Sequence, residues 1–109
     1  MEAVLDSIIQ VFEKMKSGGF PIDSPLKWGF YFVDDTAEGL ERVFDELRDH
    51  GYKLEHIEAV EDGLFQLFAS KCEVLDAERL HRRNVAFNDL AETCNVMMYD
   101  GWDVEKVPS

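Results

Sequence analysis

The stretch Asn95-Val-Met-Met-Tyr-Asp-Gly-Trp102, close to the end of the chain, decides how the rest of the sequence is interpreted. Its Val, Met and Tyr residues are typical of a buried or half-buried strand. The Asp-Gly pair interrupts that strand, because Gly101 can adopt the positive φ angle that a turn or a β-bulge requires. Trp102 adds a large apolar anchor. The stretch therefore predicts a closing β-strand with a turn or bulge inside it.

The first half of the chain predicts a helix, a strand and a second helix. In residues 2–16 apolar side chains recur at helical spacing, and Ser17-Gly18-Gly19 ends the pattern. Residues 28–33 are rich in aromatic side chains and predict a central strand. The spacing of Asp35-Thr-Ala-Glu38 resembles a capping box that starts the next helix, and Gly51 is a plausible C-terminal cap. The apolar stripe of this second helix consists of Leu40, Val43, Phe44 and Leu47.

The second half predicts a hairpin, a third helix and the closing strand. Residues 52–60 form an outer strand in which the apolar alternation slips near His56, and this slip indicates a bulge or a bend. Asp62-Gly63 is a hairpin signal, and residues 64–74 return as the third strand. The third helix runs from Asp76, its expected N-cap, to Cys94.

After the leading helix, the order of elements is β-α-β-β-α-β. This order predicts an α+β fold of the ferredoxin-like type, in which an antiparallel sheet carries both helices on one face. A chain of 109 residues with 46% hydrophobic content suffices for one core and is too short for two ordinary domains. We expect a single domain over residues 1–109, with residues 1–19 as the leading helix and residues 27–105 as the ferredoxin-like core.

The charge balance restricts the class of partner. Asp and Glu number 23 against 11 Lys and Arg, which gives a formal net charge of −12. Nucleic acid is repelled by such a chain, because phosphate contacts need clustered cations. A basic protein partner is favoured, although an acidic surface also simply promotes solubility. The chain carries neither a signal peptide nor an apolar run of membrane length, so we expect a cytoplasmic protein without membrane contact.

Catalytic, metal and cofactor sites are not indicated by any pattern in the sequence. The serines lack an elbow motif, and the histidines are too scattered to form a triad. His50 and His56 do not have metal-ligand spacing, and Cys72 and Cys94 match no redox or metal motif. We therefore expect no catalysis, no metal and no cofactor.

Aromatic residues of the first and third strands resemble the stacking platforms of RNA-binding sheets. Lys27 and Lys71 are the only cations in or beside these two strands, whereas such a platform needs basic neighbours. Core or partner-facing aromatics are therefore favoured over RNA contact. The residues concerned are Trp28, Phe30, Tyr31, Phe32, Phe65 and Phe68.

Acidic residues of the second helix are candidate contacts for a basic partner. They outnumber Arg42 and Arg48 on the same helix, and helical spacing places most of them close to one side. Two interpretations stay open: a solvated face, or a face that attracts Arg-rich segments and mainly raises the association rate. The candidates are Glu38, Glu41, Asp45, Glu46 and Asp49.

The region from Tyr52 to Trp102 resembles the family of ribonuclease E inhibitor protein B, RraB. The resemblance is carried by Gly51-Tyr52, by Glu61-Asp62-Gly63, by the helix after Asp76 and above all by Tyr99-Asp100-Gly101-Trp102. It implies a ferredoxin-like fold and a bacterial cytosolic protein that binds ribonuclease E and lowers its activity by protein contact. Tyr99, Asp100 and Trp102 thereby become candidate contacts, although a Tyr and a Trp at a strand end also commonly pack into the core.

The chain ends at Ser109 without the long acidic tail that we associate with the best-known members. A family relative with a different basic partner is therefore an open alternative. Two further alternatives are a small-molecule-sensing domain and a small enzyme with a cleft between sheet and loop. The leading helix packs either on its own chain or on a second copy, so a homodimer also remains open.

Overall fold

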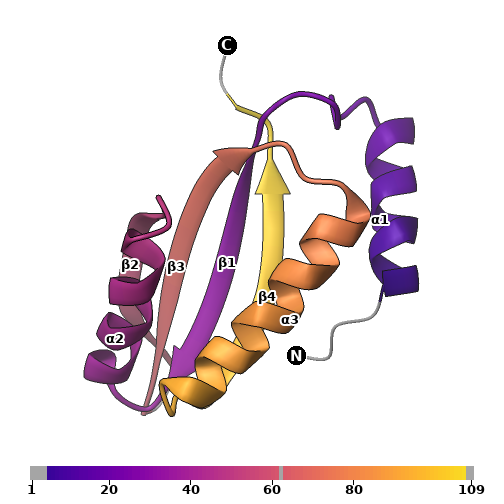
Figure 1. The fold of residues 1–109 in the computed structure, drawn as a ribbon. Coiled ribbons are helices and arrows are strands. Elements are labelled where there is room, and N and C mark those ends of the chain that lie inside the picture. The colour runs from indigo at the N-terminus through magenta and orange to yellow at the C-terminus, as the bar shows by residue number, and fades with distance from the viewer. Residues whose placement is uncertain (1–4, 62, 108–109) are drawn as a thin grey trace.

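Three helices and a four-stranded antiparallel sheet make up the fold, which confirms the α+β class. The computed structural model describes residues 5–61 and 63–107. The strands lie in the order β2-β3-β1-β4, so β1 is central and β2 and β4 form the edges (Figure 1). In chain order the elements are α1 (Leu5–Ser17), β1 (Leu26–Asp34), α2 (Ala37–Arg48), β2 (Lys53–Glu61), β3 (Leu64–Glu73), α3 (Ala77–Thr93) and β4 (Met98–Glu105).

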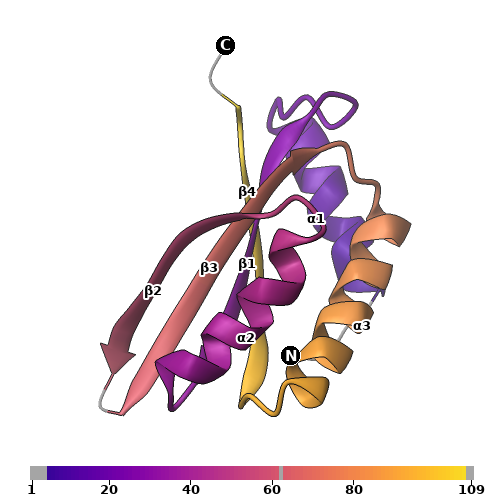
Figure 2. The ribbon, with the colours of Figure 1, turned by 60° about the vertical axis from the view of Figure 1, so that its left-hand side comes forward.

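Helices α2 and α3 lie on the same face of the sheet, as the two views show (Figures 1 and 2). Helix α2 contacts β1, β2 and β3, whereas α3 contacts β4. Helix α1 lies against α3, and its Phe12 ring stacks on Trp28 of β1 at 5.7 Å between centroids. The leading helix therefore packs on its own chain. Its buried residues, Ile8, Phe12 and Met15, join the core beneath α2 and α3.

Alternation along β1 separates the core from the opposite face. Trp28, Phe30 and Phe32 point towards the helices and are at most 1% exposed. Phe87 of α3 packs edge-on against Phe30, with 5.0 Å between ring centroids. Residues 27, 29 and 31 lie between these positions, and strand geometry directs them to the face that no helix of the described chain covers. The expectation that the β1 aromatics are mostly core residues is confirmed for these three rings.

The closing strand contains the expected bulge. Tyr31 pairs with Gly101 and Phe32 pairs with Tyr99, so Asp100 is an extra residue on β4. Gly101 has a φ of 108°, which a residue with a side chain rarely adopts. The strand itself starts at Met98, three residues later than expected, because Asn95 and Val96 bond back to the end of α3.

Two further local expectations are confirmed and one is wrong. The pairing of β2 with β3 shifts between Leu54 and His56, as the slip in alternation predicted. Asp76 caps α3 by accepting a hydrogen bond from the Arg79 amide at 2.8 Å. The cap of α2, however, is Thr36 and not Asp35, because the Thr36 hydroxyl accepts from the Gly39 amide. Residues 1–4 of the expected leading helix, and Asp62 of the hairpin turn, lie outside the described residues.

Candidate protein-binding surfaces

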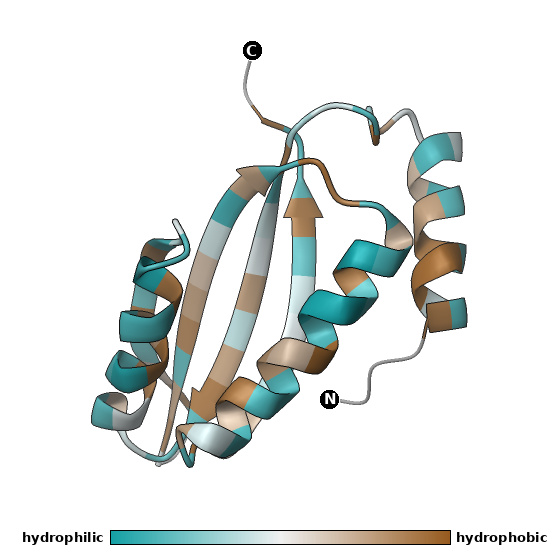
Figure 3. Ribbon diagram, viewed as in Figure 1, coloured by the Kyte–Doolittle hydropathy of each residue, from teal (hydrophilic) through white to brown (hydrophobic). Residues whose placement is uncertain are grey.

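The outer side of α2 is strongly hydrophilic (Figure 3). Its apolar stripe, which includes Leu40 and Val43, is buried against the sheet, so the charged residues of this amphipathic helix face the solvent. The structure places four of the acids that the sequence singled out on this helix and the fifth, Asp49, at its C-cap. These acids, Glu38, Glu41, Asp45, Glu46 and Asp49, are all exposed.

Both arginines of α2 are held by other groups of the same chain. Arg42 donates to the Cys94 carbonyl at 3.5 Å. Arg48 pairs with Asp45 at 3.5 Å and lies over the Phe44 ring, with its guanidinium carbon 5.2 Å from the ring centroid. Among the described residues, Asp45 is the only one of the five α2 acids that takes part in an ion pair. The helix therefore presents a surplus of carboxylates to the solvent.

The C-terminal candidates have three different environments. Tyr99 is 0% exposed and donates its hydroxyl proton to Oδ1 of Asn84, so it is a core residue. Trp102 is half-buried, and its ring lies 5.7 Å from that of Trp28. Asp100, the extra residue of the bulge, is exposed. Of these three, only Asp100 and part of Trp102 are accessible to a partner.

A second surface, which sequence reasoning did not select, lies on the side of the sheet away from α2 and α3. Tyr31 of β1 and Phe68 of β3 stack there with 4.6 Å between centroids and 6° between ring planes. The Tyr31 hydroxyl donates to Oδ2 of Asp103 on β4 at 2.6 Å. His56 of β2 lies 5.5 Å from Phe68. We call this surface the open sheet face and define it by Lys27, Gly29, Tyr31, Lys53, Glu55, His56, Glu58, Phe68, Ser70, Asp103 and Glu105.

Ion pairs order one end of the open sheet face. Lys27 contacts Glu55 and Glu105, each at 3.3 Å, and these hydrogen-bonded carboxylates, Glu105 foremost, raise the pKa of Lys27. Ser70 donates to Glu55 at 3.0 Å, and this hydrogen bond, helped by Lys27 and opposed by burial, lowers the pKa of Glu55. Lys27 is therefore already paired with two carboxylates of its own chain.

The tyrosine of the open sheet face stays protonated over the physiological range. Burial raises the pKa of Tyr31 to about 12, and the hydrogen bond to Asp103 adds to the shift. Period-2 alternation along β1 already distinguishes Tyr31 from Trp28, Phe30 and Phe32. This alternation could have predicted that Tyr31 lies on the opposite face of the sheet from the other three aromatics. It does not indicate which of the two faces the helices cover.

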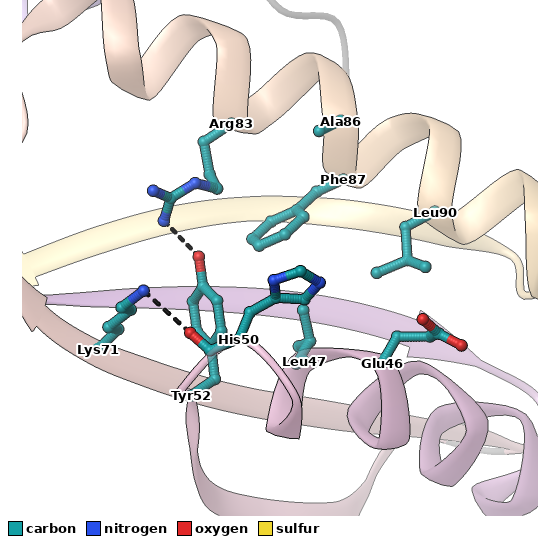
Figure 4. A pocket seen from close by; sticks show the side chains of 9 residues that line it. All are labelled: Glu46, Leu47, His50, Tyr52, Lys71, Arg83, Ala86, Phe87 and Leu90. Carbon is teal, nitrogen blue, oxygen red and sulfur yellow. Dashed lines mark hydrogen bonds between the residues drawn. The ribbon is translucent and has the colours of Figure 1, made fainter.

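A cavity of about 340 Å³ lies between α2, α3 and β3 (Figure 4). Its two cations, Lys71 and Arg83, are hydrogen-bonded to other groups of the chain. Arg83 bonds to the Tyr52 hydroxyl and makes a two-pronged contact with Glu73 at 2.9 and 3.1 Å, while Lys71 donates to the His50 carbonyl at 2.9 Å. Burial works to lower the pKa of Arg83, but its bonds to Glu73 and Tyr52 outweigh burial and the pKa is raised. The cations of this cavity therefore already have partners within the chain.

Groups suited to metal binding do not gather in the described part of the chain, where no three His, Cys, Asp or Glu side chains are placed to hold an ion. Cys72 and Cys94 are both free. None of the helices in residues 5–61 and 63–107 combines the length and apolar character needed to cross a membrane.

Fold and surfaces together define a small acidic α+β protein whose exposed features are broad charged and aromatic faces. The family model described as regulator of ribonuclease activity B, RraB, matches residues 6–104. The match spans nearly the whole chain, so this protein belongs to the RraB family, and the resemblance based on residues 52–102 is confirmed. The family is one of regulators of ribonuclease activity. No curated protein matches the sequence.

Proposed function

We propose that this protein is a non-catalytic inhibitor that binds an endoribonuclease of the E type by direct contact and lowers its activity towards RNA. The family match over residues 6–104 is the observation that carries the proposal. The protein itself uses neither a cofactor nor a metal in this role. Its place of action is the cytoplasm of a bacterial cell, and its fold is of the ferredoxin-like type, which the order β2-β3-β1-β4 and the antiparallel pairing support.

The net charge of −12 supports a partner segment that is basic. Exposed acids of α2 give one side of the molecule a negative potential that attracts Lys and Arg over about 8 Å at physiological salt. Such long-range attraction mainly raises the association rate. A basic segment that otherwise holds RNA or partner enzymes would be covered in the complex, and inhibition would follow from that competition.

The exposed contacts in this proposal are the α2 acids Glu38, Glu41, Asp45, Glu46 and Asp49, together with Asp100 and the accessible part of Trp102. Tyr99 supports β4 from within the core and does not touch the partner. The same surfaces suit a basic partner other than ribonuclease E, which is the nearest alternative within the family.

Association kinetics with immobilised full-length ribonuclease E test the proposal. The variant E41K/D45K/D49K should associate about tenfold more slowly than the wild type at low salt, and the difference should shrink as salt rises. A matched control, E13K/D23K/E78K, changes the net charge equally on exposed residues outside α2 and should lose less. Absence of wild-type binding at low salt would contradict the inhibitor role, and equal loss in both variants would contradict the α2 contact.

A second candidate function, small-molecule sensing, is favoured only by the cavity beside Tyr52 and Arg83. Lys71 uses one N–H donor for the His50 carbonyl and an ammonium group has three, so an anionic amphiphile is the chemistry that fits, with Phe87 and Leu90 as the apolar lining. Ligand-induced thermal stabilisation by carboxylate-bearing compounds, abolished in the variant K71A, would support this candidate. An unchanged melting temperature would leave the inhibitor proposal as the only one.

A further inference from the structure

We propose that the open sheet face is a docking site for arginine side chains of a basic, extended protein segment. In this arrangement a guanidinium group lies on the Tyr31–Phe68 stack and pairs with the neighbouring carboxylates. This inference rests on the proposed function and extends it, because it names arginine as the side chain that the regulator binds in its basic partner. It also assigns a surface distinct from α2, which lies on the opposite side of the sheet (Figure 2).

The aromatic platform on this face is held in place by the sheet. Tyr31 and Phe68 are paired across β1 and β3, so the backbone register places their side chains next to each other. Their rings are nearly parallel, at 6°, with 4.6 Å between centroids. Both side chains are only partly buried, although most other aromatics of β1 lie in the core. A partly exposed, fixed aromatic surface is suited to a planar ligand group.

The position of the Phe68 ring depends on the absence of a side chain at Gly29 of the central strand. A Cβ atom at this position would lie 2.3 Å from Cε1 of Phe68 and 2.5 Å from Oδ1 of Asp103. Glycine weakens a strand interior, and it commonly marks a site where another group approaches the backbone closely. Here its missing side chain lets the Phe68 ring and the Asp103 carboxylate close over β1.

Carboxylates surround the platform and outnumber the lysines beside them. Asp103 lies at one side, where it accepts from Tyr31, and Glu58 lies near His56 at 3.5 Å. Glu55 and Glu105 complete the set, with Lys27 held between them and Lys53 3.7 Å from Glu55. These four carboxylates and two ammonium groups leave a surplus of negative charge at neutral pH. The face thus complements a cationic ligand.

Arginine fits this chemistry better than other ligands. Its planar guanidinium stacks on aromatic rings and pairs with carboxylates through a fork of donors, whereas the Lys ammonium is a strongly hydrated point charge. The carboxylates repel the phosphates of nucleic acid. They also repel the same face of a second copy of this chain, which argues against a sheet-to-sheet dimer. The surface therefore favours binding of an Arg-rich protein segment over nucleic acid or a second copy of this chain.

Dissociation kinetics from full-length ribonuclease E separate this surface from α2. The variants Y31A and F68A should dissociate about tenfold faster than the wild type, because they remove the stacking surface. D103N should also dissociate faster, since it keeps the shape of the side chain and removes its charge. E41K/D45K/D49K should instead affect mainly association. Circular dichroism and thermal unfolding confirm that each variant is folded before binding is compared.

A direct probe uses deca-arginine and deca-lysine peptides and does not depend on the ribonuclease. The wild type should bind deca-arginine about tenfold more tightly than deca-lysine, and F68A and D103N should each lose most of this preference. Equal affinity for the two peptides, or an unchanged preference in both variants, would overturn the inference. If peptide preference is seen while ribonuclease E does not bind, the docking site stands and the proposed function fails. Self-association through this face, detected by sedimentation and abolished in F68A, would also overturn it.

Discussion

The substitution Tyr99→Phe tests whether the first residue of the motif Tyr99-Asp100-Gly101-Trp102 stabilises the hydrophobic core. Tyr99 is 0% exposed and Asn84 is 1% exposed, so water cannot replace the hydrogen bond between the Tyr99 hydroxyl and Oδ1 of Asn84. The ring contacts with Phe32 and Phe87 persist in the variant, because only one oxygen is removed. Leaving a buried acceptor unpaired costs about 1–3 kcal/mol. We expect the free energy of unfolding to fall by that amount, which is a large share of the roughly 5–15 kcal/mol typical of small domains.

Urea unfolding followed by circular dichroism measures this change. The matched control is Tyr31→Phe, which removes a hydroxyl from a partly exposed hydrogen bond with Asp103 and should cost less than about 1 kcal/mol. The double variant Y99F/N84L replaces both buried partners by apolar groups and should recover part of the loss. If Y99F is as stable as the wild type, or if Y31F is the more damaging of the pair, the reasoning about Tyr99 is wrong.

Three further expectations concern stability. Thr36→Ala should destabilise the protein by about 1 kcal/mol in urea unfolding because it removes the α2 cap, whereas Asp35→Ala should change little; the reverse order would mean that the cap is misassigned. Gly29→Ala should cost about 1–3 kcal/mol through overlap with Phe68, and much less in a Phe68→Ala background; full additivity of the two changes would refute the overlap. Burial raises the pKa of Tyr52 from its ordinary value of 10.0 to about 12, so its neutral phenol stabilises the fold fully below pH 10 and this contribution is lost as pH rises towards 12. Urea unfolding on both sides of this window should show that loss, and Tyr52→Phe should reduce it to the part that Tyr31 contributes; a wild-type stability that does not fall in the window would contradict the shift.

Local patterns were sufficient to predict most elements of the fold. The apolar stripe of α2, the Asp76 cap and the bulge at Asp100-Gly101 each follow from residues close together in the chain, and each is present. The α2 cap was misplaced by one residue because Asp35 and Thr36 are both good caps, and only the approach of Thr36 to the Gly39 amide decides between them.

The surfaces were harder to predict because they depend on pairing between distant strands. The acids of α2 lie within one helix, so helical spacing alone indicated that they share a surface. Tyr31, Phe68 and Asp103, in contrast, come from three strands and meet only in the register of the finished sheet. The sequence showed neither which side of β1 the helices cover nor that Gly29 leaves room for the Phe68 ring. The hydrogen bond of Tyr99 was hard to predict for the same reason, since its partner Asn84 lies on a different element, α3.

Titration of ribonuclease E with the wild-type protein, at a fixed RNA concentration and low salt, asks whether this chain acts by contact with the nuclease. We expect the cleavage rate to fall to a floor as the protein approaches equivalence with the nuclease, and the midpoint to rise in proportion when the nuclease concentration is raised at constant RNA. Full cleavage at saturating protein would contradict the claim. So would a midpoint that does not move with the nuclease concentration, because the protein would then act on the RNA and not on the enzyme.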